Sequence, residues 1–108
     1  MTIEHVNAQS LLGSIDVIRL LVVERNIDVL CVSETWLNSN TPDVFVKISG
    51  YNIFRYDGGR GGGVCIYVKD VLTTNVINLD IPKQEGVEDT WVTVQCRKLP
   101  SIIVRCVY

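Results

Sequence analysis

Long apolar runs, an excess of basic residues and paired cysteines are all missing from this sequence of 108 residues. No stretch approaches the roughly 18 apolar residues that a membrane-spanning helix needs, so we expect no membrane association. The N-terminus lacks a basic segment followed by an apolar one, which predicts no secretory signal and an intracellular protein, nuclear or cytoplasmic. The formal net charge of −2 gives no basic footprint typical of a non-specific nucleic-acid binder.

The cysteines do not form a metal-binding pattern. None belongs to a Cys-x-x-Cys pair, and each lies within an apolar or alternating run. We therefore interpret them as small apolar residues of strands in a reducing compartment. The four are Cys31, Cys65, Cys96 and Cys106.

The remaining composition is that of one globular domain. Hydrophobic residues make up 47% of the chain and charged residues 20%, which excludes a disordered tail. A chain of this length buries a core with little margin, so each strand face matters for stability.

The first third of the sequence predicts a βαβ unit. Ile3 to Val6 is a strand candidate, and apolar residues at helical spacing predict a helix from Ile15 to Arg25 capped by Ser14. Val29 to Ser33 is a continuous apolar run that predicts a strand buried on both faces. Strand, helix and strand within about 30 residues predict parallel pairing of the two strands.

Two polar residues follow these strands. Asn7 comes directly after the first strand and Glu34 directly after the second. Because the carboxyl ends of adjacent parallel strands meet at one edge of a sheet, where open α/β proteins bind ligands, we expect the two side chains to lie close together. A solvated charge at a strand end and an asparagine in a turn are the alternative interpretations.

After residue 50 the pattern changes to the period of strands, with turn and loop signals between them. The sequence predicts two hairpins and one further strand. The predicted strands are Tyr51 to Tyr56, Gly62 to Val68, Val71 to Leu79, Thr90 to Arg97 and Ile102 to Tyr108. The predicted loops are Leu37 to Gly50 and Asp80 to Asp89.

The glycine-rich segment from Gly58 to Gly63 invites comparison with a phosphate-binding loop. It lacks the Lys-Ser/Thr ending of such a loop, and it precedes a strand where a phosphate loop precedes a helix. An arginine-glycine RNA-binding tract would need repeats. We interpret the segment as a hairpin turn in which glycines adopt positive φ.

Five segments together resemble the endonuclease/exonuclease/phosphatase superfamily, and most closely the endonuclease domain of non-LTR (LINE-type) retrotransposons. They keep the family's order and span the chain. They are His5 to Leu11, Asp28 to Leu37, Gly50 to Asp57, Gly59 to Val68, and Val107 with Tyr108. The resemblance implies an α/β fold, a partial four-layer α/β/β/α (DNase I-like) sandwich with one βαβ unit followed by mostly antiparallel strands. It also implies hydrolysis of DNA phosphodiesters with Mg²⁺ or Mn²⁺.

The resemblance also assigns roles to three residues. Glu34 matches the metal-binding glutamate, Asn7 matches an asparagine that contacts the scissile phosphate region, and Tyr108 matches a tyrosine that hydrogen-bonds the phosphate. Gln9 stands where abasic-site repair relatives carry an aspartate, so a second carboxylate at the metal is not expected. The family's later Gly-Asp-Phe-Asn and Ser-Asp-His segments are absent, and the single histidine, His5, does not match the catalytic histidine.

We therefore expect residues 1–108 to be a single, C-terminally truncated domain of this kind, inactive alone and with weak metal binding. The expected partners are DNA in the intact parent protein and the missing C-terminal half of the domain. The alternatives are an inactive fragment of a decayed element or partial gene, and a phosphatase-type member of the same superfamily.

We also expect self-association through open sheet edges, because one helix cannot cover every apolar strand face. The faces in question are Val64-Ile66-Val68, Val92-Val94-Cys96 and Ile102-Val104-Cys106.

Overall fold

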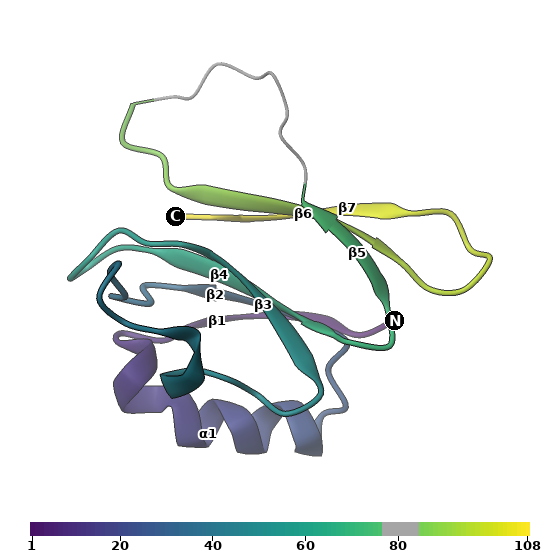
Figure 1. The fold of residues 1–108 in the computed structure, drawn as a ribbon, viewed down its shortest axis with the longest axis horizontal. Helices are drawn as coiled ribbons and strands as arrows, with labels where there is room; N and C mark the ends of the chain where they lie inside the picture. Colours follow the sequence, from purple (N-terminus) through teal and green to yellow (C-terminus); the bar gives the residue numbers. More distant parts are fainter. Residues whose placement is uncertain (77–84) are drawn as a thin grey trace.

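Residues 1–76 and 85–108 are described by a computed structural model, in which they form three layers (Figure 1). Helix α1 covers one face of a four-stranded sheet, and a three-stranded sheet packs on the opposite face. The strand orders are β1-β2-β4-β3 and β5-β6-β7. The elements are β1 (Ile3–Asn7), α1 (Leu11–Glu24), β2 (Val29–Ser33), the 3₁₀ helix η1 (Asp43–Phe45), β3 (Tyr51–Tyr56), β4 (Val64–Lys69), β5 (Thr73–Val76), β6 (Asp89–Gln95) and β7 (Ile102–Val107).

The first three elements confirm the predicted βαβ unit. β1 and β2 are parallel neighbours, with Ile3 opposite Val29 and Asn7 opposite Ser33. All five residues of β2 are buried, as its continuous apolar run indicates. The carboxyl ends of β1 and β2 therefore lie side by side at one edge of the sheet.

Helix α1 begins one turn earlier than the sequence predicts. Ser10, not Ser14, is the N-cap, and its Oγ accepts a hydrogen bond from the Gly13 N–H at 3.4 Å. The Ser14 hydroxyl instead donates to the Ala8 carbonyl at 2.8 Å and ties the helix to the end of β1. The helix ends where expected, and Asn26 follows with a left-handed φ of 48°.

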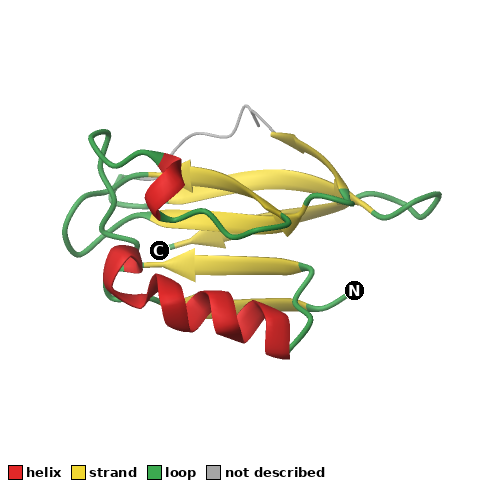
Figure 2. Cartoon of the chain, turned by 60° about the horizontal axis from the view of Figure 1, so that its bottom comes forward, coloured by secondary structure: helices red, strands yellow, loops and turns green. Residues whose placement is uncertain are grey.

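One stripe of α1 packs against the four-stranded sheet, and Figure 2 shows the helix running along the strands that it covers. Leu20 and Val23 are apolar but lie outside this stripe, and they are 58% and 76% exposed. They lie on the opposite side because 3.6 residues per turn places them away from the buried positions. The cluster contains Leu11, Ile15, Ile18 and Val22 of the helix with Leu30, Val32, Cys65 and Tyr67 of the sheet.

The other face of the four-stranded sheet forms a second core with β6 and β7. Its members include Val64, Ile66, Val68, Val92, Val94, Val104 and Cys106, all buried. Each sheet covers most of the apolar face of the other, more than the sequence predicts from a single helix. Cys96 is only partly buried, and Ile102 remains 37% exposed.

The loop before β3 is anchored by Arg55. Its guanidinium contacts Asp43 at 2.7 Å and Asp57 at 2.9 Å, and it also donates to the carbonyls of Thr41 and Asn38. The Arg55 side chain is only 14% exposed, and its charge-assisted bonds tie η1 and the loop before it to β3.

The remaining predictions concern the second sheet. The strand predicted from Val71 to Leu79 appears as β5, and residues 77–79 lie outside the described residues. The first five residues of the predicted loop from Asp80 to Asp89 also lie outside them, while Asp89 already belongs to β6. The predicted hairpin across residues 98–101 is confirmed by the antiparallel pairing of β6 and β7. Within the described ranges, no helix has the length and apolar character needed to cross a bilayer.

Candidate functional site

The carboxyl ends of β1 and β2 form a rim that carries the predicted site residues. Asn7 is the last residue of β1 and Ser33 the last of β2, and Glu34 follows at once. The two chains stay together beyond the strands, because the Ala8 N–H donates to the Ser33 carbonyl at 2.9 Å and the Ser10 N–H donates to the Glu34 carbonyl at 3.0 Å. Asn7 and Glu34 thus stand on the same rim.

Tyr108 reaches this rim from the other sheet. It follows β7, and its hydroxyl donates to Oε1 of Glu34 at 3.3 Å across a sequence separation of 74 residues. The negative charge of Glu34 raises the pKa of the Tyr108 phenol, and burial and the hydrogen bond itself act in the same direction. Tyr108 therefore stays a neutral hydrogen-bond donor beside the carboxylate.

Asn7 lies on the exposed face of the rim. Its Oδ1 accepts a hydrogen bond from the Gln9 N–H at 3.2 Å, which orients the amide. No described residue accepts a hydrogen bond from its Nδ2, so this donor remains available to a ligand. Asn7 makes no hydrogen bond with Glu34 or Tyr108 in the described part of the chain. Its neighbour His5 places Nε2 at 3.1 Å from the Ser33 hydroxyl.

Backbone strain gathers in the two segments that leave β1 and β2. Among the described residues, four of the six non-glycine residues with positive φ lie here: Gln9 (44°), Ser10 (86°), Glu34 (53°) and Trp36 (56°). Such conformations cost on the order of 1–3 kcal/mol each and concentrate at functional sites. The glycine-rich turn helps to hold them, because its carbonyls accept from Thr35 N–H at 3.2 Å and Trp36 N–H at 2.9 Å.

Glu88 belongs to this rim although it lies in the predicted loop from Asp80 to Asp89. Its Oε1 accepts from the Gly63 N–H at 3.1 Å, and its backbone pairs with that of Tyr108 in both directions, at 2.8 and 3.3 Å. A Cβ on Gly58 or Gly62 would collide with the Glu88 carboxylate. Glu88 therefore joins the glycine-rich turn to Tyr108. A lone acid in a polar loop carries no sequence signal of such a role.

The oxygen atoms around Glu34 are compatible with weak binding of a divalent cation. The described residues contain no group of three His, Cys, Asp or Glu side chains arranged to hold a metal. Glu34 nevertheless presents a half-buried carboxylate that Tyr108 orients. Mg²⁺ takes oxygen ligands and retains several waters, so one carboxylate with neighbouring neutral oxygens is compatible with it. A closed metal cage is not formed by the described residues.

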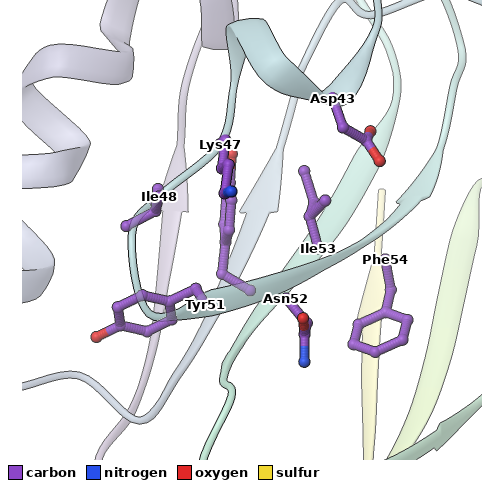
Figure 3. Close-up of a pocket in the computed structure, with 8 residues that line it drawn as sticks. Asp43, Lys47, Ile48, Tyr51, Asn52, Ile53 and Phe54 are labelled. Carbon is purple, nitrogen blue, oxygen red and sulfur yellow. The ribbon is translucent and has the colours of Figure 1, made fainter.

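A pocket of about 470 Å³ lies elsewhere, along β3 and the segment that precedes it (Figure 3). Figure 3 shows Asp43 and Lys47 on one side and Tyr51 to Phe54 along the strand. Its lining contains none of Asn7, Glu34 and Tyr108. The candidate site is therefore the open rim and not this hollow.

Comparisons with known proteins support the fold. No protein-family model matches the chain, and no curated protein matches it. Among solved structures, the AP endonuclease LMAP from Leishmania major aligns with 97% of this chain at a TM-score of 0.67 and 18% identity. An AP endonuclease from Archaeoglobus fulgidus aligns with 95% at a TM-score of 0.63 and 24% identity. The chain has a DNase I-like fold.

A third DNase I-like structure, the 3′ phosphatase NExo from Neisseria bound to a product DNA hairpin, aligns with 95% of the chain at a TM-score of 0.61 and 17% identity. The chain spans about two-fifths of each of these proteins, covering 38%, 40% and 40% of their lengths. The predicted α/β fold class is thereby confirmed, with the layers α, β and β present in the described residues.

Proposed function

We propose that this chain forms the cation-binding part of a metal-dependent phosphodiesterase site, in a nuclease of the endonuclease/exonuclease/phosphatase superfamily. The observation that carries the proposal is the hydrogen bond between Tyr108 and Glu34, which joins the two sheets on the rim that also bears Asn7. This hydrogen bond and the parallel pairing of β1 and β2 support a site that combines Asn7, Glu34 and Tyr108 at one edge of the fold.

Each residue has a distinct role in this proposal. Glu34 would hold Mg²⁺ or Mn²⁺, and the cation would supply Lewis-acid polarisation of a phosphoryl oxygen. The single hydroxyl proton of Tyr108, which Glu34 accepts in this structure, would turn to a phosphate oxygen once Glu34 holds the cation. The Nδ2 of Asn7 donates to a second phosphate oxygen. Fixed donors of this kind stabilise the negative charge that develops during phosphodiester hydrolysis.

DNA is the proposed substrate, acted on in an intact parent protein. The solved neighbours support this choice, since two are AP endonucleases and the third is bound to a DNA hairpin. The finer assignment to a LINE-type endonuclease rests on the run Ser33-Glu34-Thr35-Trp36 and the arginine-glycine turn before β4. We propose that the base and further phosphate contacts lie in a C-terminal half of the domain outside these 108 residues.

A titration with Mg²⁺ or Mn²⁺ followed by NMR tests the role of Glu34. We expect weak binding that perturbs the amides around Glu34, and we expect Glu34→Gln to abolish the response. The matched control is Glu24→Gln, which removes an exposed glutamate at the end of α1 and leaves the response intact. Saturation at micromolar cation, or an unchanged response in Glu34→Gln, would contradict the proposal.

If the base and further phosphate contacts lie outside these 108 residues, the chain alone should be inactive. The 108-residue chain should not nick supercoiled plasmid above background, because general acid–base help contributes about 10²–10⁴-fold and positioning contributes more. Metal-dependent nicking by the purified chain that disappears in Glu34→Ala would show that the described residues already include a working base.

A further inference from the structure

Two thiols lie in the core between the two sheets, on the strands that lead to Glu34 and Tyr108. Cys31 is at the centre of β2 and Cys106 is near the end of β7, and both belong to the inter-sheet core. The Cys106 thiol donates to the carbonyl of Val32, the residue after Cys31, at 3.5 Å. Both cysteines are free.

The geometry suits a disulfide between the sheets. β2 and β7 approach to within 8 Å between Cα atoms, and a disulfide usually spans roughly 4.4–6.8 Å between them. The Cys106 side chain lies against the part of β2 that carries Cys31, because its Sγ is 3.5 Å from the carbonyl of Val32 and both cysteines belong to the same inter-sheet cluster. A disulfide between packed sheets is an established feature of β-sandwich proteins. The other two cysteines lack this arrangement, because Cys65 packs in the core beneath α1 and Cys96 lies beyond the end of β6.

We propose that Cys31 and Cys106 are a redox modification site, which peroxide oxidises to a disulfide that locks the two sheets together at the candidate site. Glu34 lies three residues beyond Cys31, and Tyr108 lies two residues beyond Cys106. The cross-link therefore fixes the spacing of the two strands that carry these side chains.

Cys31 is the thiol that reacts first. It is 8% exposed against 2% for Cys106, and its neighbour across β1, His5, is exposed on the same face. The neighbouring Cys106 lowers the pKa of the Cys31 thiol, although burial opposes this, whereas Cys31 and burial raise the pKa of the Cys106 thiol. Cys31 is thus the nucleophile, and Cys106 retains the proton that it donates to the Val32 carbonyl.

The reaction consumes one peroxide and two thiols. The Cys31 thiolate attacks a peroxide oxygen, so an S–O bond forms, the O–O bond breaks, and the leaving hydroxide takes up the thiol proton as water. The Cys106 sulfur then attacks the sulfenic sulfur of Cys31. The S–S bond forms, the S–O bond breaks, and hydroxide leaves with the Cys106 proton as the second water. Two thiols are oxidised and hydrogen peroxide is reduced to two waters.

Peptide mapping tests the site in the intact 108-residue chain. The reduced protein is treated with hydrogen peroxide, its remaining thiols are alkylated, and non-reducing digests are analysed by mass spectrometry. We expect a peptide that links Cys31 to Cys106 in a monomer lighter by two hydrogen atoms. Cys31→Ala and Cys106→Ala should abolish the link, and Cys65→Ala and Cys96→Ala should retain it.

A second measurement separates a cross-link from a folding defect of the variants. Oxidation should raise the thermal midpoint of the wild-type chain, and a reducing thiol should reverse the rise. If Cys31→Ala or Cys106→Ala fails to fold, the peptide map of the oxidised wild-type chain and the reversible change in its thermal midpoint still test the proposal. Links to Cys65 or Cys96, links between chains, or sulfinic acid at Cys31 without a cross-link would overturn the proposal. None of these results depends on metal binding or nuclease activity.

Discussion

At the scale of single residues, the contact between Glu34 and Tyr108 is an electrostatic one that can be measured without catalysis. We expect Glu34→Gln to lower the pKa of the Tyr108 phenol toward its ordinary value, because the carboxylate is the largest cause of the rise. The measurement is an NMR titration of the Tyr108 ring. Glu24→Gln, a change on the distant helix, should leave that titration unmoved.

The contact between Glu34 and Tyr108 also makes the stability of the fold depend on pH. Because the folded state raises the phenol pKa above its unfolded value, the contact stabilises the fold below the unfolded pKa, and this stabilisation is lost as the pH rises through the folded pKa. An equal phenol pKa in wild type and Glu34→Gln would show that the carboxylate and the hydroxyl do not interact in solution.

Individual site residues show which positions a sequence pattern can predict and which it cannot. Asn7 and Glu34 could be placed on one rim because each directly follows a strand of a βαβ unit, so their proximity is a local consequence of topology. Glu88 could not be placed there, since its contacts with Gly63 and Tyr108 depend on how two separate sheets meet.

At the scale of elements, two glycines of the glycine-rich turn that both have positive φ differ in the space around them. Gly63 has φ +91°, and a Cβ there would collide with the Thr35 hydroxyl, whereas Gly59 has φ +69° with open space around it. We expect Gly59→Ala to lower the free energy of unfolding by about 1–2 kcal/mol from left-handed strain alone. Gly63→Ala should cost more, by about 1–3 kcal/mol, because the clash is added to the strain.

Chemical denaturation of the two glycine variants provides the comparison. Equal losses would mean that Thr35 moves away freely and that the turn is not packed against the segment after Glu34. A larger loss at Gly63 would mean that the turn and the rim behave as one unit.

The start of α1 is an element whose boundary the sequence pattern misplaces. Ser14 and Ser10 are both acceptable caps by residue type. Ser10 is chosen because the chain leaving β1 is bound to the chain leaving β2, through the Ser10 N–H to Glu34 and the Leu11 N–H to Thr35 at 2.9 Å. Helix boundaries set by such long-range bonds are not visible in local periodicity.

At the scale of the whole molecule, the packing of one sheet on the other carries the second core. Ile66 is fully buried between the sheets, and Ile103 is 60% exposed on β7. We expect Ile66→Ala to lower the free energy of unfolding by about 2–5 kcal/mol. The same substitution at Ile103 should change it by about 0.5 kcal/mol or less.

Thermal or urea unfolding of these two variants tests the arrangement, since both remove the same atoms from β-strands. Similar effects at Ile66 and Ile103 would mean that the two sheets do not pack as described. A cooperative transition in the wild-type chain would show that the sheets form one unit.

Some apolar side chains on the end strands of both sheets remain exposed. Ile3 at one end of the four-stranded sheet is 45% exposed, and Ile103 and Val107 on β7 are 60% and 47% exposed. β1 and β7 are both end strands in their sheets. Self-association through these edges stays a prediction, and size-exclusion chromatography across a concentration series measures it.

The sequence by itself determined the parallel βαβ unit, the later hairpins and the location of Asn7 and Glu34 at the same edge of the sheet. Each of these follows from the period of apolar residues and from turn chemistry, which act over short stretches of chain. Only the tertiary structure decided that the two sheets cover most of each other's apolar faces, that Tyr108 reaches Glu34, and that Cys106 contacts Val32, the residue after Cys31. These contacts join residues about 74 positions apart, and their geometry depends on sheet packing, which no local pattern encodes.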